Sequence, residues 1–155
     1  MEPENPSYPA LGEARRQRAN LHDQLVHVEQ AISSPAYGRL EEWASQVVKE
    51  MVGMRDAFEQ HVLVTEKPDG LYEEIMHKAP RLAGKMQRLQ EEHPTISAAV
   101  AATLERLEAG DIEGSWGVDE CRDDLQRLLG QIVRHRQHGA DLVWEAYNLD
   151  IGGPE

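Results

Sequence analysis

The sequence predicts an all-α protein, built as an antiparallel up-and-down bundle of four helices. Apolar residues recur at alternating spacings of three and four along its long segments, the pattern of a helix that buries one face in a bundle. Short stretches rich in proline or glycine separate these segments, and no segment alternates as a β-strand does. Four amphipathic helices with short connections pack most simply as a bundle.

The first helix is predicted from about Leu11 to Ser33. Pro35 ends it, because the residue before a proline is disfavoured in the α conformation. Its apolar positions are Leu21, Leu25, Val28 and Ile32. Residues 1–10, which include three prolines, are expected to form a flexible tail, residues 11–150 a single domain, and residues 151–155 a second tail.

The second helix is predicted from about Gly38 to Thr65. Its inward positions are Leu40, Ala44, Val47, Met51, Met54, Phe58, His61 and Thr65. A turn at residues 67–70 follows it, and then a short helix from Leu71 to Lys78 that Pro80 closes.

The third long helix is predicted from about Arg81 to Ala109 and the fourth from about Val118 to Asn148. The stripe of the third helix keeps its phase across Pro94, which favours one bent helix over two. Its inward positions are Leu82, Met86, Leu89, His93, Ile96, Val100 and Leu107. Those of the fourth helix are Cys121, Leu125, Leu128, Ile132, His135, Gly139, Leu142 and Ala146.

Three of these core positions are histidines on three different helices: His61, His93 and His135. Counted from the helix ends, His93 and His135 should lie at one level, and His61 roughly 10 Å deeper. Inward imidazoles from separate helices, together with a carboxylate, match the ligand sets of iron, manganese and zinc. The other interpretation is that each histidine is a core residue satisfied by a hydrogen bond.

Other candidates for the site lie beside the predicted stripes. Glu66 is one residue past Thr65, His22 is one residue past Leu21, and Glu145 is next to Ala146. The three tryptophans fall in different places relative to the predicted stripes. Trp43 and Trp144 flank stripe residues and are expected to pack in the core or in a groove, whereas Trp116, in a loop, is a candidate for an exposed contact residue.

Composition narrows the classes of partner. The chain has 16 Lys+Arg against 28 Asp+Glu, a formal net charge of −12, which repels phosphate backbones and anionic lipids. Neither nucleic acid nor a membrane is therefore an expected partner. The single cysteine, Cys121, is expected to be buried, and the acidic, proline-rich start lacks the features of a secretory signal, so a cytoplasmic location is expected.

Several segments together resemble the hemerythrin-like, or HHE cation-binding, family, in a divergent bacterial branch. They are residues 58–66 (FEQHVLVTE), 69–74 (DGLYEE), 79–82 (APRL), 91–93 (EEH), 134–137 (RHRQ) and 145–153 (EAYNLDIGG). The resemblance implies a four-helix bundle that holds a di-iron centre. Carried over by position, it implies His61, His93 and His135 as metal ligands, with His22 as a possible ligand from the first helix.

The chain departs from the family pattern in each of the last three ligand motifs. Thr65 stands four residues after His61, Ser97 four after His93, and Ala140 five after His135, where the family has further ligands; Glu66 and Asp141 come one place late. The sequence therefore lacks a full di-iron ligand set.

Two hypotheses follow. The first is a bundle that binds a non-haem metal, iron above all, through His61, His93, His135 and a carboxylate such as Glu66, and that senses or consumes oxygen, peroxide or nitric oxide. Open coordination positions would receive such ligands. The second is a metal-free bundle that acts as an interaction or regulatory module, its acidic surface binding a basic partner. Self-association through a helix face is a third possibility.

Overall fold

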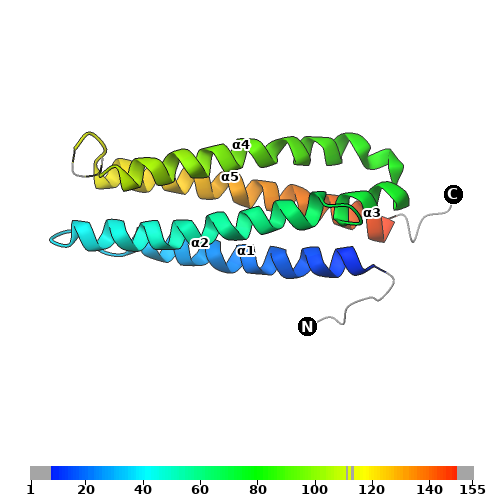
Figure 1. The fold of residues 1–155 in the computed structure, drawn as a ribbon, viewed down its shortest axis with the longest axis horizontal. Helices are drawn as coiled ribbons and strands as arrows, with labels where there is room; N and C mark the ends of the chain where they lie inside the picture. Colours follow the sequence, from blue (N-terminus) through cyan, green and yellow to red (C-terminus); the bar gives the residue numbers. More distant parts are fainter. Residues whose placement is uncertain (1–7, 111, 113, 150–155) are drawn as a thin grey trace.

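The computed structural model describes residues 8–110, 112 and 114–149, and none of these residues is in a β-strand. Four long helices lie side by side along a common axis (Figure 1): α1 (Pro9–Ser33), α2 (Leu40–Glu66), α4 (Ala83–Glu108) and α5 (Val118–Trp144). The prediction of an all-helical bundle is confirmed. None of the helices in the described residues has an apolar stretch of membrane-spanning length.

The two ends of the bundle are built differently. At one end short connections join α1 to α2 and α4 to α5 (Figure 1). At the other end lie the short helix α3 (Leu71–Lys78), the 3-10 helix η1 (Pro80–Leu82) and the π-helix η3 (Glu145–Leu149). We call these the loop end and the α3 end.

The turn between α2 and α3 depends on two backbone positions. Asp69 has a φ of 59°, a left-handed conformation that aspartate tolerates better than most residues. A Cβ on Gly70 would lie 2.7 Å from the carbonyl oxygens of Val64 and Lys67, so only glycine fits there. The chain can therefore begin α3 directly after α2 ends, as the sequence predicts.

Several predicted boundaries shift: α2 begins at Leu40 and ends at Glu66, and α5 ends at Trp144, where the π-helix η3 begins. Helix α1 begins at Pro9, inside the predicted tail, because proline is well suited to the first turn of a helix. The third long helix begins at Ala83, after the 3-10 turn, and continues through Pro94 to Glu108. The short helix at 71–78 has the predicted bounds. The predicted tails at 1–7 and 151–155, and the domain's last residue at 150, lie outside the described residues.

The apolar interior is divided into two cores. The loop-end core includes Phe58, Ile96 and Ile132, and the α3-end core includes Leu89 and Leu142. His93 stands between Leu89 and Ile96 on α4, and His135 between Ile132 and Leu142 on α5. Together with His61 they form a polar layer between the cores, which we call the histidine layer.

Two tryptophans correct the predictions made for them. Trp116 is 1% exposed: its indole donates a hydrogen bond to Asp124 Oδ2 at 2.8 Å, and the Arg106 guanidinium lies 4.1 Å from its ring centroid. Trp144 is 54% exposed, because it stands two residues, about 200° of helical rotation, from both Leu142 and Ala146. Trp43 is fully buried, as expected. Cys121 is also buried, and its burial raises the pKa of the thiol to about 12.

Candidate metal centre

The three histidines of the sequence pattern meet in space. The ring centroids of His93 and His135 are 4.9 Å apart, and His61 lies 5.2 Å from each. One ring nitrogen from each of the three lies within 4.8 Å of the others. The predicted common level of His93 and His135 is confirmed. His61 is at the same level rather than roughly 10 Å deeper, because α3 and η1 lengthen the connection between α2 and α4.

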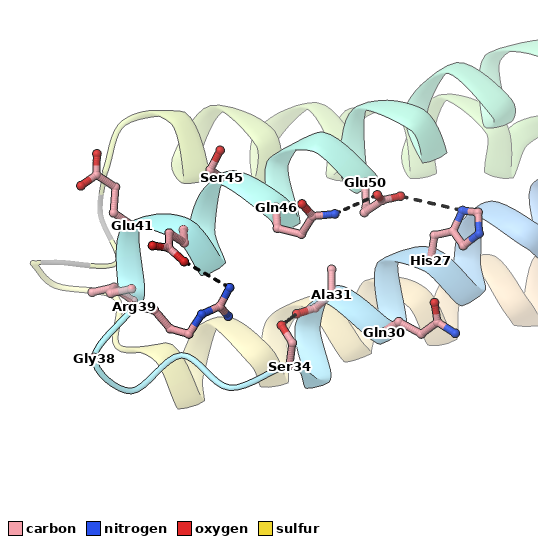
Figure 2. Close-up of a pocket in the computed structure, with 12 residues that line it drawn as sticks. His27, Gln30, Ala31, Ser34, Gly38, Arg39, Glu41, Ser45, Gln46 and Glu50 are labelled. Carbon is pink, nitrogen blue, oxygen red and sulfur yellow. Dashed lines mark hydrogen bonds and ion pairs between the residues drawn. The ribbon is translucent and has the colours of Figure 1, made fainter.

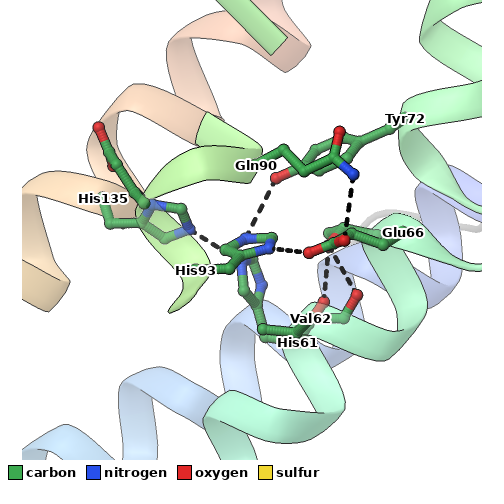
Figure 3. Close-up of polar contacts among 9 residues, drawn as sticks. His61, Val62, Glu66, Tyr72, Gln90, His93 and His135 are labelled. Atoms are coloured by element: carbon green, nitrogen blue, oxygen red, sulfur yellow. Dashed lines mark hydrogen bonds and ion pairs between the residues drawn. The ribbon is translucent and has the colours of Figure 1, made fainter. Parts of the chain in front are cut away.

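A carboxylate contacts the outward nitrogen of two of these rings. His93 Nδ1 is in close contact with Glu66 Oε2, and Glu66 also accepts a hydrogen bond from Gln90 at 3.1 Å (Figure 3). His135 Nδ1 donates to Glu92 Oε1 at 2.7 Å. A carboxylate on Nδ1 holds the proton there and leaves the Nε2 lone pair available. Both rings therefore present an unprotonated nitrogen to the interior.

The remaining hydrogen bonds follow from those tautomers. The Nε2 atoms of His61 and His135 are 3.1 Å apart, so His61 donates and His135 accepts. The Tyr72 hydroxyl donates to His93 Nε2 at 3.3 Å, with its ring stacked on the imidazole at 14° (Figure 3). Two chains of hydrogen bonds result, and each begins at a glutamate on the edge of the bundle.

Phe58 forms the wall of the histidine layer on the side of the loop-end core. Its ring centroid lies 5.6 Å from that of His61 and 5.9 Å from those of His93 and His135. His93 and His135 are each 2% exposed, whereas His61 is partly exposed. The layer is thus closed by an aromatic ring on one side and partly accessible beside His61.

Burial keeps the three imidazoles neutral. It lowers the pKa of His61 to about 3, and any positive charge on His93, His135 or Arg136 acts in the same direction. Burial also lowers the pKa of His93 and of His135, against the opposing effects of Glu66 and Glu92. Neutral imidazole is the form that binds metal ions.

The donor set suits a transition-metal ion. His93 and His135 present free lone pairs, and His61 would bind through Nε2 once its proton moves to Nδ1. Three such nitrogens match sites that hold zinc or iron. Two ligands that are each about 2.1 Å from one ion span at most roughly 4.2 Å, so the widest nitrogen pair would have to close by less than about 1 Å. The 3.1 Å separation of the His61 and His135 nitrogens already fits two neighbouring ligands.

No protein-family model, curated protein or solved structure matches the chain. Its site is therefore interpreted from the side chains alone.

The other predicted ligands lie outside the three-nitrogen cluster. Glu66 binds the outer nitrogen of His93, a position that orients a ligand. His22 is exposed, because it is one residue, about 100° of rotation, past the fully buried Leu21. Glu145 accepts a hydrogen bond from Lys85 at 2.8 Å.

Three residues near the layer were not among the predicted site residues. Glu92 and Tyr72 contact His135 and His93. Gln17 lies on α1, and its buried side-chain oxygen has no hydrogen-bond partner among the described residues. The Glu13–Lys67 ion pair and the approach of Gln24 to Gly53 place Gln17 level with His61. Extending the α1 stripe back by four residues from Leu21 would have reached it.

A pocket opens on the histidine layer between α1, α2, α3 and α5. Its volume is about 290 Å³, and His61, His135, Thr65 and Tyr72 form its inner end. It gives a small molecule a route to His61 and His135 from the surface.

A larger hollow at the loop end has a different character (Figure 2). Several of its polar groups are paired with one another: His27 Nδ1 lies 3.8 Å from Glu50, Gln46 donates to Glu50 at 3.1 Å, and Arg39 lies 3.4 Å from Glu42 (Figure 2). Because these groups already satisfy each other, the histidine layer is the better candidate for the functional site.

Proposed function

We propose that the protein is a hemerythrin-like, antiparallel up-and-down bundle that binds a single non-haem iron ion through His61, His93 and His135. Its function would be to sense or consume oxygen, peroxide or nitric oxide. One observation carries the proposal: three neutral imidazoles from three helices converge, and carboxylates orient two of them.

A single ion fits the chain better than a di-iron centre. The positions where a hemerythrin would provide further ligands hold Thr65, Ser97 and Ala140. The Thr65 hydroxyl donates to the carbonyl oxygens of its own helix, His61 O at 2.9 Å and Val62 O at 3.1 Å. Ser97 is exposed. Three protein ligands would remain, and an ion with so few keeps open positions.

The residues around the layer have distinct roles in this proposal. Bound iron would supply a Lewis-acidic, redox-active centre able to accept a small ligand. Glu66 and Glu92 hold the protons on the outer nitrogens and keep the ligand nitrogens aimed inward. Tyr72 retains its proton, because burial raises the pKa of its hydroxyl. With His93 Nε2 bound to an ion, that O–H would be free to donate a hydrogen bond to a molecule in the pocket. Phe58 excludes water from the opposite side.

A metal-free bundle that serves as an interaction module is the second candidate. It is favoured by the hydrogen bond between the His61 and His135 nitrogens, which satisfies both atoms with no ion present. The net charge of −12 would then favour a basic partner. The two candidates differ in how stability responds to metal.

Thermal unfolding with and without a chelator separates them. An ion that binds only the folded state at 1,000 times its Kd stabilises by about 4 kcal/mol, so chelation should lower the Tm by several degrees. His93→Ala should lose that sensitivity, because it removes one of three ligands. Metal content, measured after growth in iron-supplemented medium, should be close to one iron per chain in the wild type.

His22→Ala is the matched control, since His22 is an exposed histidine outside the cluster. It should keep the full response to chelator. A wild-type Tm that ignores chelator, together with less than stoichiometric metal, would refute the iron proposal and favour the metal-free bundle. In that case His93→Leu should be neutral or stabilising, since it replaces a buried polar group with an apolar one of similar size.

A further inference from the structure

The pocket beside the histidine layer has an unusual charge for this protein. Arg15, Arg18 and Arg136 line it, and among its described lining residues none is acidic. The chain as a whole carries 28 acidic residues against 16 Lys+Arg. A cavity lined by arginine without carboxylate is therefore a local exception on an acidic protein, and it suits an anion.

Within the described residues, neither Arg18 nor Arg136 has an acidic partner. The Nε atom of Arg136 is buried and has no hydrogen-bond partner in the described part of the chain. Arg18 lines the same pocket, so two guanidinium groups of like charge face one cavity. A buried donor without a partner is destabilising, and so are two like charges side by side. A bound anion would relieve both.

The rest of the pocket is apolar. Leu11 and Ala14 from α1 and Leu142 and Val143 from α5 line it, and the absence of a side chain at Gly139 leaves open space. Trp144, 54% exposed, lies on the same lining. A volume of about 290 Å³ is at the lower end of the range of small-molecule pockets, about 300–1,000 Å³. Charge and shape together indicate a small anion with an apolar body.

We propose that this pocket binds a small organic carboxylate, with the carboxylate between Arg18 and Arg136 and the apolar body against Leu142, Val143 and Trp144. Arginine binds carboxylates in a bidentate geometry, and a planar indole covers an apolar group well. Because His61 and His135 form the inner end, the ligand would lie directly beside the histidine layer. The binding site is built without any metal, so this inference goes beyond the iron proposal and does not depend on it.

Trp144 provides a local reporter. Trp43 and Trp116 are both buried in the loop-end core, whereas Trp144 lines the pocket. Cyclohexanecarboxylate, which does not absorb where tryptophan does, is titrated while tryptophan emission is followed, and calorimetry measures the same affinity. We expect saturable binding that Trp144→Phe makes invisible to fluorescence but not to calorimetry. Cyclohexanecarboxamide, the neutral analogue, should bind roughly 10- to 100-fold more weakly.

Substitutions locate the carboxylate. Arg136→Gln and Arg18→Gln should each weaken binding of cyclohexanecarboxylate roughly 10- to 100-fold. Arg134→Gln is the matched control, because Arg134 is on the same helix but outside the pocket; its affinity should be unchanged. Inorganic phosphate, which has no apolar body, should bind at least about 10-fold more weakly than cyclohexanecarboxylate.

A pocket-filling variant tests the location independently. A Cβ added at Gly139 would have no heavy atom within 4 Å, so Gly139→Leu should fold and extend into the open space. It should keep the wild-type Tm or exceed it, and lose binding.

Each arm is repeated with chelator and with added Fe(II). Binding that persists in both conditions supports the arginine site even where iron does not bind. The proposal is overturned by carboxamide binding as tightly as carboxylate, by Arg136→Gln and Arg134→Gln behaving alike, or by binding that requires iron. If only the iron proposal fails, the metal content and the response of the Tm to chelator would show it, and binding of cyclohexanecarboxylate would be unchanged.

Discussion

The loop end and the α3 end of this bundle differ in how they use their buried space. At the loop end the core is continuous: Trp43, Met51, Met54 and Leu125 are all fully buried. Towards the α3 end the interior is interrupted by the histidine layer, by a pocket and by Gln17, whose buried oxygen is unpaired. The same helices pass through both regions, so the difference comes from side chains rather than from topology.

The comparison indicates that one part of each long helix stabilises the fold and another part forms the candidate site. Tightly packed apolar residues stabilise strongly, while buried polar groups without full hydrogen bonding weaken a fold. Stability therefore resides mainly at the loop end, and the α3 end can hold open space and neutral imidazoles because the loop end compensates. Low local stability is also typical of functional regions.

The largest expected change in the free energy of unfolding comes from replacing a tryptophan at the loop end rather than one at the α3 end. Trp43 is fully buried, and its indole donates to Ile32 O at 3.4 Å, whereas Trp144 is 54% exposed. Trp43→Ala should lower the free energy of unfolding by about 3–5 kcal/mol, because it leaves a large cavity. Trp144→Ala should change it by no more than about 0.5 kcal/mol. Urea unfolding of both variants measures the difference.

Equal losses for the two variants would remove the distinction between the ends. Trp43→Phe serves as a control for fold integrity, since it keeps an aromatic ring and should lose much less than the alanine variant.

A second, smaller effect concerns pH and acts only on the histidine layer. Burial, above all, holds the pKa of His61 in the folded protein at about 3, against an ordinary value of 6.5 in the unfolded chain. Below pH 6.5 the unfolded chain therefore binds more protons than the folded one, and acidification favours unfolding. The free energy of unfolding of chelator-treated protein should be level above about pH 7 and fall by up to about 1.4 kcal/mol per pH unit for each such group below pH 6.5.

The lowered pKa values of His93 and His135 add to this slope in the same direction. Urea titrations at intervals from pH 7.5 to 5 measure it. His61→Leu should make the curve shallower, and His22→Ala, at an exposed position, should leave it unchanged. A curve that stays flat down to pH 5 would show that the histidines are not held neutral by burial.

Much of this arrangement could be predicted because it follows from helical phase. The alternating spacing of three and four predicts the helices and places His93 and His135 in the interior at one level. Each of these positions depends only on the rotation and rise along the residue's own helix.

Other features depend on contacts between distant segments. Trp116, in the loop between α4 and α5, is buried in the loop-end core, where Arg106 of α4 lies over its ring and Asp124 of α5 accepts a hydrogen bond from its indole. The level of His61 depends on how α3 and η1 fold back, which no spacing within α2 encodes. The partnership of Glu92 with His135 joins α4 to α5. The sequence pattern thus indicated which residues face inward, and tertiary packing determined which of them meet.

The smallest expected effect tests whether α1 belongs to the histidine layer. Gln17 lies between Ala14 of the α3-end core and Leu21 of the loop-end core, and in the part of the chain that the structure describes its buried Oε1 atom has no hydrogen-bond partner. A buried acceptor left unpaired destabilises a fold, so Gln17→Leu should raise the free energy of unfolding of chelator-treated protein by about 1 kcal/mol. The substitution would thereby make the histidine layer resemble the loop end.

Gln24→Leu is the matched control for that experiment, because Gln24 lies two turns along the same helix, beside Gly53 rather than beside the histidines. Both variants are unfolded in urea with chelator and with Fe(II). If the Gln17 oxygen interacts with a bound ion or its ligand, Gln17→Leu should gain stability only in chelator and should lose part of the stabilisation by iron, whereas Gln24→Leu should respond to iron as the wild type does. A Gln17→Leu variant that is less stable than the wild type in chelator would show that the Gln17 oxygen is hydrogen-bonded in solution. Helix α1 would then contribute a structural contact to the histidine layer rather than an open acceptor.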